Sequence, residues 1–182
     1  LNFQDYDSLN IKNYGVKIHA PELFENNFIL DLAANDKKTR DISIDFMEKT
    51  IEVAHLIYSK SAQNTSLDLI INPGGHSSDF FLKEEQKLKL FKNLKNSFDK
   101  LDFGLVNPII QSMPPYPWHL GGRRYHNMFV ECEDFKKWHE MTGLFFCIDY
   151  SHSFLAAKYL NIPFEDYISK IEKYSSYFHV AD

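Results

Sequence analysis

The sequence predicts an α/β fold built around a parallel β-sheet. Short apolar segments alternate with amphipathic helical segments along the chain. Such alternation implies right-handed crossovers between parallel strands. The predicted strands are apolar, as expected where the sheet is covered on both faces. Polar side chains gather where these strands end, and parallel α/β folds bind ligands at that edge of the sheet.

The predicted elements follow one another in a regular order. Strands are expected at 14–21, 66–75, 103–115, 144–149 and 177–182, and helices at 36–59, 82–101, 132–142 and 162–175. Helical spacing of apolar residues supports each helix. The buried positions are predicted to be Ile44, Met47, Ile51, Ala54 and Tyr58; then Leu88, Phe91, Leu94, Phe98 and Leu101; then Phe135 and Trp138; and finally Phe164, Tyr167, Ile168 and Ile171.

Length and composition limit the function classes. The 182 residues suffice for one domain with a core, and the net charge of −5 comes without a basic stripe, so we expect no nucleic-acid partner. Two cysteines in unrelated contexts, Cys132 and Cys147, suit a reducing cytoplasm. No apolar run reaches the roughly 20 residues of a membrane span, so we expect no membrane partner.

Each predicted strand ends on polar side chains. They are His19, Asn72, Gln111, Asp149 with His152, and His179. Carboxylate and imidazole donors suit a divalent cation such as Zn²⁺, Mn²⁺ or Mg²⁺. We therefore predict a metal site of Asp149, His152 and His179, with Gln111 as a weak fourth ligand. The alternative is that Asp149 caps a helix and that the two imidazoles are only hydrogen-bonded within the core.

Several stretches carry a resemblance to a known superfamily: KIHAPEL, IINPGGHS, QSMPP, CIDYSHS and FHVAD. Together they resemble the xylose-isomerase-like TIM-barrel superfamily, which includes sugar isomerases, sugar epimerases and metal-dependent abasic-site endonucleases. The resemblance implies that residues 1–182 form a single partial (β/α)8 TIM barrel, with strands 3 to 7 and their helices. It also implies that Asp149 and His152 form the family's metal pair. Because the chain starts at Leu1 and stops after an apolar strand at Asp182, we expect a piece of a longer polypeptide.

Two positions depart from the family pattern. The endonucleases have His where this chain has Asn72, and most metal-dependent members have Glu where it has Gln111. A neutral amide is a poorer ligand than a carboxylate and cannot act as a base. Phosphodiester cleavage by these endonucleases relies on several metals, and the loss of both ligands weakens such a site. The endonuclease function is therefore the least favoured hypothesis. The resemblance implies that the family's base on strand 8 would lie beyond residue 182, so the catalytic residues stay unknown from this sequence.

The segment 113–130, MPPYPWHLGGRRYHNMFV, resembles more narrowly the barrel domain fused to, or encoded beside, bacterial sialic-acid-type (nonulosonate) synthases. Its arginines could clamp a carboxylate or phosphate, and Trp118 and Tyr116 could stack on a sugar ring. An equal alternative is a surface loop anchored by its aromatic residues. The candidate substrate-binding residues are His19, Asn72, Trp118, His119, Arg123, Arg124 and His126.

The leading hypothesis is a metal-assisted sugar or sugar-phosphate isomerase or epimerase, with a small-molecule sugar substrate, in nonulosonate biosynthesis. One metal would polarise a carbonyl while a base moves a proton on carbon. The second hypothesis is a non-catalytic sugar-binding domain that supports a fused or neighbouring synthase. Gln111 and Asn72 favour that second hypothesis, because both replace groups that the family's chemistry uses.

Overall fold

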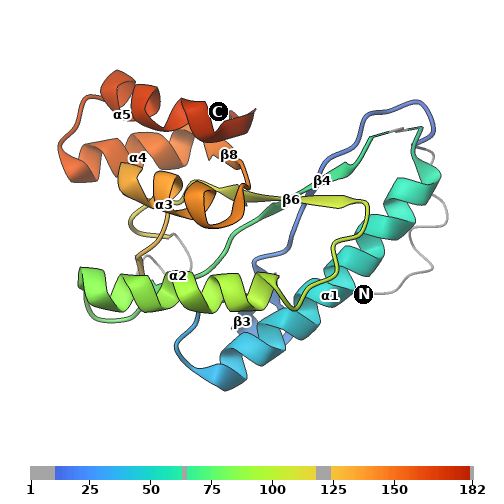
Figure 1. Ribbon diagram of the computed structural model, residues 1–182, viewed down its shortest axis with the longest axis horizontal. Coiled ribbons are helices and arrows are strands. Elements are labelled where there is room, and N and C mark those ends of the chain that lie inside the picture. The colour runs from blue at the N-terminus through green and yellow to red at the C-terminus, as the bar shows by residue number, and fades with distance from the viewer. Residues whose placement is uncertain (1–10, 63–64, 118–123, 181–182) are drawn as a thin grey trace.

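The computed structural model describes residues 11–62, 65–117 and 124–180, and its centre is a parallel five-stranded sheet (Figure 1). The strand order is β1-β4-β6-β8-β9. Each neighbouring pair is parallel. The strands are β1 Ile18–His19, β4 Leu67–Ile71, β6 Val106–Gln111, β8 Phe146–Asp149 and β9 Ser175–His179.

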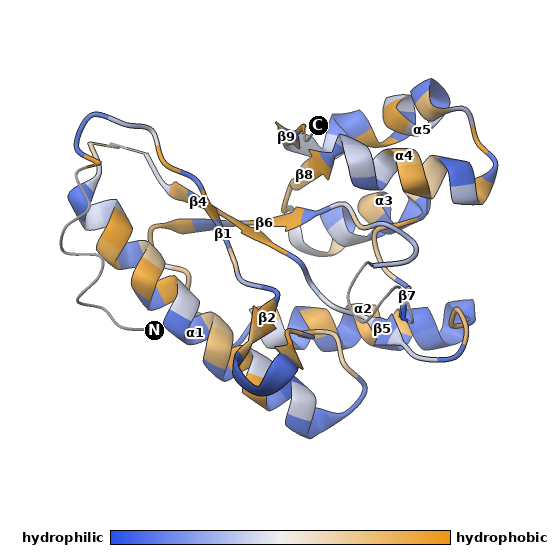
Figure 2. Ribbon diagram, turned by 180° about the vertical axis from the view of Figure 1, so that it is seen from behind, coloured by the Kyte–Doolittle hydropathy of each residue, from blue (hydrophilic) through white to orange (hydrophobic). Residues whose placement is uncertain are grey.

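Helices connect consecutive strands of this sheet, as parallel pairing requires. They are α1 Lys37–Lys60, α2 Glu84–Phe98, α3 Cys132–Thr142, α4 Tyr150–Leu160 and α5 Phe164–Ile171, with 3₁₀ turns at Glu25–Asn27 and Glu172–Tyr174. Figures 1 and 2 show α1 and α2 on one side of β4 and β6, and α3 to α5 gathered beside β8. In the described part of the chain, no helix is both long and apolar enough to cross a membrane.

Two small antiparallel ribbons, each of two short strands, lie in the loops at the carboxyl edge of the sheet. Leu23–Phe24 (β2) pairs with Phe28–Ile29 (β3), and His76–Ser77 (β5) pairs with Tyr125–His126 (β7). The second ribbon joins the loop after β4 to the loop after β6. Sequence reasoning predicted neither ribbon, because two-residue strands carry no detectable periodicity.

The sheet has two unequal apolar faces. The alternation of side chains along β4 turns Leu67, Leu69 and Ile71 toward the helices, where they join the main core. The opposite face, called here the inner face, carries a small cluster of Ile70, Ile109, Cys147 and the half-buried Tyr177. Burial raises the pKa of Cys147 to about 12, with a smaller contribution from Asp149, so this thiol stays protonated and packs as an apolar group.

The predicted α/β fold is confirmed, and most predicted buried positions are buried. Ile44, Met47, Ile51 and Ala54 of α1 are in the core, as are Phe135 and Trp138 of α3. The prediction for Leu88 was wrong, because this side chain is 42% exposed. Lys87 is buried in its place, since the inward stripe of α2 runs one residue earlier, through Leu90, Phe91 and Leu94.

One helix was not predicted at all. The segment after Asp149 continues directly into α4, with Asp149 itself as the N-cap residue. Phe154 and Leu155 are exposed on this helix, so apolar residues occupy both its faces and the helical stripe is obscured.

Candidate functional site

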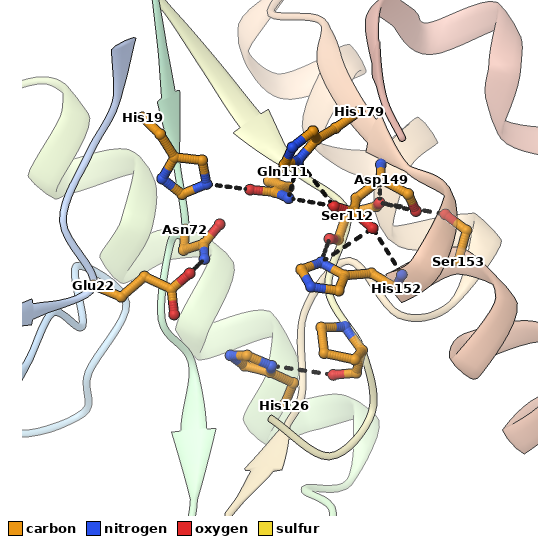
Figure 3. Close-up of polar contacts among 11 residues, drawn as sticks. His19, Glu22, Asn72, Gln111, Ser112, His126, Asp149, His152, Ser153 and His179 are labelled. Carbon is orange, nitrogen blue, oxygen red and sulfur yellow. Dashed lines mark hydrogen bonds and ion pairs between the residues drawn. The ribbon is translucent and has the colours of Figure 1, made fainter. Parts of the chain in front are cut away.

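Four neighbouring strands bring polar side chains together on the inner face of the sheet (Figure 3). On each strand an apolar residue precedes the polar one by two positions, so both point to the same face. The pairs are Ile70 and Asn72, Ile109 and Gln111, Cys147 and Asp149, and Tyr177 and His179. The apolar members form the inner-face cluster. The polar members therefore stand in a layer above it, at the carboxyl edge of the sheet.

Asp149 is the centre of this polar layer. Only 3% of the residue is exposed. Its Oδ2 accepts a hydrogen bond from Nε2 of Gln111 at 2.9 Å and lies 3.0 Å from Nδ1 of His179. Its Oδ1 accepts a hydrogen bond from the backbone N–H of His152 at 2.9 Å. A buried carboxylate needs such donors, and the side chain of Gln111 and the backbone of His152 supply two of them.

Gln111 links Asp149 to His19. Its Oε1 lies 2.6 Å from Nε2 of His19, and Nδ1 of the same ring lies 2.8 Å from the carbonyl oxygen of Ala20. Both oxygens are hydrogen-bond acceptors that face the two ring nitrogens of His19. The amide of Gln111 thus lies between the imidazole of His19 and the carboxylate of Asp149, with its oxygen toward the first and its nitrogen toward the second.

His152 is held by the backbone at the end of β6. Its Nδ1 lies 2.8 Å from the carbonyl oxygen of Ser112, which requires a hydrogen on Nδ1. In the neutral ring, Nε2 then keeps a lone pair. Ser112 also fixes Asp149, because the backbone N–H of Asp149 donates a hydrogen bond to Oγ of Ser112 at 2.9 Å. The predicted alternative of a helix cap and a hydrogen-bonded histidine therefore holds alongside the convergence of these side chains.

Asn72 and Glu22 form the opposite side of the layer in Figure 3. The Asn72 amide donates to Oε1 of Glu22, which follows β1. Oδ1 of Asn72 is buried and has no hydrogen-bond partner among the described residues. Buried polar atoms are normally paired, so this oxygen is an unmet hydrogen-bond acceptor at the edge of the layer. Sequence reasoning missed Glu22, although its place three residues after the end of β1 was a usable signal.

Asp31 is a second acidic residue that sequence reasoning missed. Its carboxylate accepts from the backbone N–H of Gly75 at 2.8 Å, of Ala33 at 3.1 Å and of His76 at 3.4 Å. Burial raises its pKa to about 6, although these hydrogen bonds and Arg124 oppose the rise. Asp31 thereby fixes the turn after β4, where Gly74 and Gly75 both have positive φ. The tight turn predicted there, rather than a phosphate cradle, agrees with this geometry.

The donor atoms do not fit a divalent cation as they lie. The Gln111 group nearest Asp149 and His179 is the amide nitrogen, which donates hydrogen and cannot ligate a metal. Within residues 11–62, 65–117 and 124–180, no group of three or more His, Cys, Asp or Glu side chains could hold a metal ion. The predicted metal site of Asp149, His152, His179 and Gln111 is therefore brought together spatially but not arranged as a coordination shell.

The remaining predicted substrate-binding residues are dispersed. Trp118, His119 and Arg123 lie outside the described residues. Arg124 lines a hollow of about 520 Å³ with Asp31 and the β2–β3 ribbon, and no residue of the polar layer lines that hollow. His126 is buried, stacks on His76 and contacts the carbonyl oxygen of Pro114. Tyr116 packs against Phe81, Tyr125 and Tyr159.

The sheet order, the crossover helices and the polar carboxyl edge define a partial TIM barrel, as predicted. The solved structures that share this architecture include two that are named as sugar epimerases or epimerase-like. One is a D-tagatose 3-epimerase-like protein, with a TM-score of 0.60 and 14% identity over 97% of this chain and 58% of that one. The other is the D-allulose 3-epimerase from Methylomonas sp. in complex with D-allulose, with a TM-score of 0.56 and 10% identity over 84% of this chain and 48% of that one.

The chain thus spans about half the length of these structural neighbours. No protein-family model and no curated protein matches the sequence. The likeness establishes the fold, as the xylose-isomerase-like resemblance predicted. The narrower resemblance to the domain associated with sialic-acid-type synthases receives no support from either neighbour and stays a prediction.

Proposed function

We propose that the polar layer is a sugar-binding site and that the protein acts as a sugar isomerase or epimerase. The observation that carries this proposal is the convergence of Asn72, Gln111, Asp149 and His152 in one layer of hydrogen-bond donors and acceptors at the carboxyl edge of the sheet. A polyol offers hydroxyl groups that both donate and accept hydrogen bonds, so it matches such a mixed layer. The likeness to two sugar-epimerase structures supports the same substrate class.

Isomerisation or epimerisation of a ketose removes a proton from carbon next to a carbonyl, and this step requires a base. We assign proton transfer to Nε2 of His152 and to the carboxylate of Glu22. Nδ1 of His152 is bonded to the Ser112 carbonyl oxygen, which leaves Nε2 as the acceptor. In Figure 3 Glu22 lies beside Asn72 and His152 lies beside Ser112 and Asp149, and we propose that the two bases approach the substrate from these two sides.

Solvent deuterium uptake tests this proposal. The purified protein is incubated in D₂O with D-allulose, D-tagatose and D-fructose, and loss of the C–H signal next to the carbonyl is followed by proton NMR. We expect exchange in at least one sugar and a loss of about 100-fold or more in His152→Gln and Glu22→Gln. His55→Gln, an exposed histidine on α1, is the matched control and should exchange as the unchanged protein does.

A second candidate function is non-catalytic sugar binding in support of a synthase. The neutral amide of Gln111 favours it, because this amide stands where a carboxylate base would act. Sugar binding without any deuterium uptake would select this candidate, and absence of binding would reject both. The sequence of segment 113–130 motivates a place in nonulosonate biosynthesis in the cytoplasm, with a sialic-acid-type synthase as partner.

A further inference from the structure

The environment of Asp149 accounts for its negative charge without a metal. Two hydrogen bonds reach the oxygens of this buried carboxylate, one from the backbone N–H of His152 and one from Nε2 of Gln111, and Nδ1 of His179 lies 3.0 Å from Oδ2. A carboxylate that awaits a cation would keep an oxygen lone pair directed at an open position. Here Oδ2, the oxygen that faces the polar layer, already has two of these partners.

The orientation of the Gln111 amide follows from its neighbours. Rotating the amide by half a turn would bring Oε1 against Oδ2 of Asp149, where its nitrogen now lies at 2.9 Å. Two acceptor oxygens would then face each other without a hydrogen between them. The observed orientation avoids this contact, so the nitrogen is held toward Asp149 and His179.

The charge of the side chains beside His179 is also unfavourable for binding a divalent cation. Of the two layer residues that contact His179, Asp149 is a carboxylate and Gln111 is a neutral amide, while the carboxylate of Glu22 bonds Asn72 on the opposite side of the layer. Affinity for a hard divalent cation depends on the number of charged oxygen ligands. One carboxylate beside His179, already accepting two hydrogen bonds, is a weak basis for a metal centre.

We propose that the amide nitrogen of Gln111 occupies the place of a cation, so that this site binds its sugar by hydrogen bonds alone. The inference deepens the proposed function and rests on it for the identity of the ligand. The same geometry implies that a carboxylate at position 111 would convert the layer into a cation site, since it would place two acidic side chains beside His179.

Manganese titration tests the inference on the unchanged protein, Gln111→Glu and Gln86→Glu. The last variant is the matched control, because it adds the same charge at the exposed N-terminus of α2, where Glu also satisfies the capping geometry. We expect Gln111→Glu to bind one Mn²⁺ at least about tenfold more tightly than the other two proteins. The added Asp149→Asn change should abolish that gain.

Two results would overturn the inference. One is saturable binding of one Mn²⁺ to the unchanged protein that is lost in Asp149→Asn. The other is a folded Gln111→Glu variant, judged by circular dichroism, with no gain in affinity. If that variant does not fold, the titration of the unchanged protein decides.

Sugar binding measured with and without EDTA separates this inference from the proposed function. Binding of D-allulose that is unchanged by EDTA supports both. Binding of D-allulose that requires added metal would refute the inference, but it would still support the proposed sugar site. Absence of sugar binding under both conditions would refute the proposed function, while the manganese titration would still judge the role of Gln111.

Discussion

The carboxylate of Asp149 accepts a hydrogen bond from the backbone N–H of His152 at 2.9 Å, so one side chain both caps α4 and faces the polar layer. Its two oxygens divide these tasks. Oδ1 serves the helix, and Oδ2 contacts Gln111 and His179. Helix start and site geometry are therefore coupled at this residue.

Substitution at Asp149 should separate the two tasks. Serine caps a helix nearly as well as aspartate but is too short to reach Gln111. We expect Asp149→Ala to unfold about 1 kcal/mol more easily than Asp149→Ser, measured by urea denaturation. Both variants should lose sugar binding to the same degree. Equal stability of the two variants would show that the cap contributes nothing.

The turn after β4 should tolerate no side chain at Gly74. This residue has a φ of +84°, and a Cβ there would overlap the side chain of Asp31. We expect Gly74→Ala to lose about 3 kcal/mol or more of stability, from backbone strain and the displaced carboxylate. Gly143→Ala is the control, because its φ is +73° but its Cβ would meet no atom. Its cost should stay near about 1 kcal/mol in the same denaturation assay.

The raised pKa of Asp31 predicts a dependence of stability on pH. Its folded value of about 6 exceeds the ordinary 3.8, so between these values the folded state binds more protons than the unfolded state. Stability from this residue is complete below about pH 4 and declines as the pH rises through 6, by about 3 kcal/mol in total. Asp31→Asn should remove this decline. Asp45→Asn, on the exposed side of α1, should retain it, and identical pH profiles for both variants would contradict the assignment.

Lys87 should be indispensable to the packing of α2 on α3. Its ammonium lies 3.0 Å from Glu131 and 3.1 Å from the buried Asp134. Burial alone would lower the pKa of Lys87, but these two carboxylates outweigh it and raise the pKa. We expect Lys87→Met to cost about 3 to 5 kcal/mol, because Asp134 would stay buried without its partner.

A companion change gives the control for Lys87. In the double variant Lys87→Met with Asp134→Asn, the orphaned charge is gone, so a large part of the lost stability should return. Lys95→Met, which removes an exposed pair with Asp99, should cost less than about 1 kcal/mol. Purely additive effects in the double variant would argue against the buried pair.

The polar residues at the strand ends could be predicted from the sequence, because alternation within each strand shows which of its residues share one face of the sheet. A period of two places Gln111 above Ile109 and Asp149 above Cys147 without knowledge of the partner strand. Parallel pairing then brings these positions to one edge. The pattern within each strand was sufficient for this prediction. The assignment of the sheet to a partial TIM barrel rested on the resemblance to a barrel family.

The unpredicted features depend on contacts between distant segments. Asp31 acts on Gly75, which lies 44 residues later, and Asn72 bonds Glu22 across 50 residues. The burial of Lys87 likewise requires carboxylates from α3. Sequence pattern reports local periodicity, so it could not show which acid meets which partner. Nor could it show which way the amide of Gln111 is turned.

The most direct test of the sugar site is NMR of protein labelled with ¹⁵N in its histidine side chains, titrated with D-allulose and D-tagatose. The polar layer contains His19, His152 and His179, while His55 and His139 bond backbone carbonyls of Phe103 and Leu144 elsewhere. We predict saturable shifts of the first three imidazoles and unmoved signals from the last two. Sugar-dependent shifts confined to His55 and His139, or no shift at any of the five at saturating sugar, would contradict a sugar site at the carboxyl edge of this sheet.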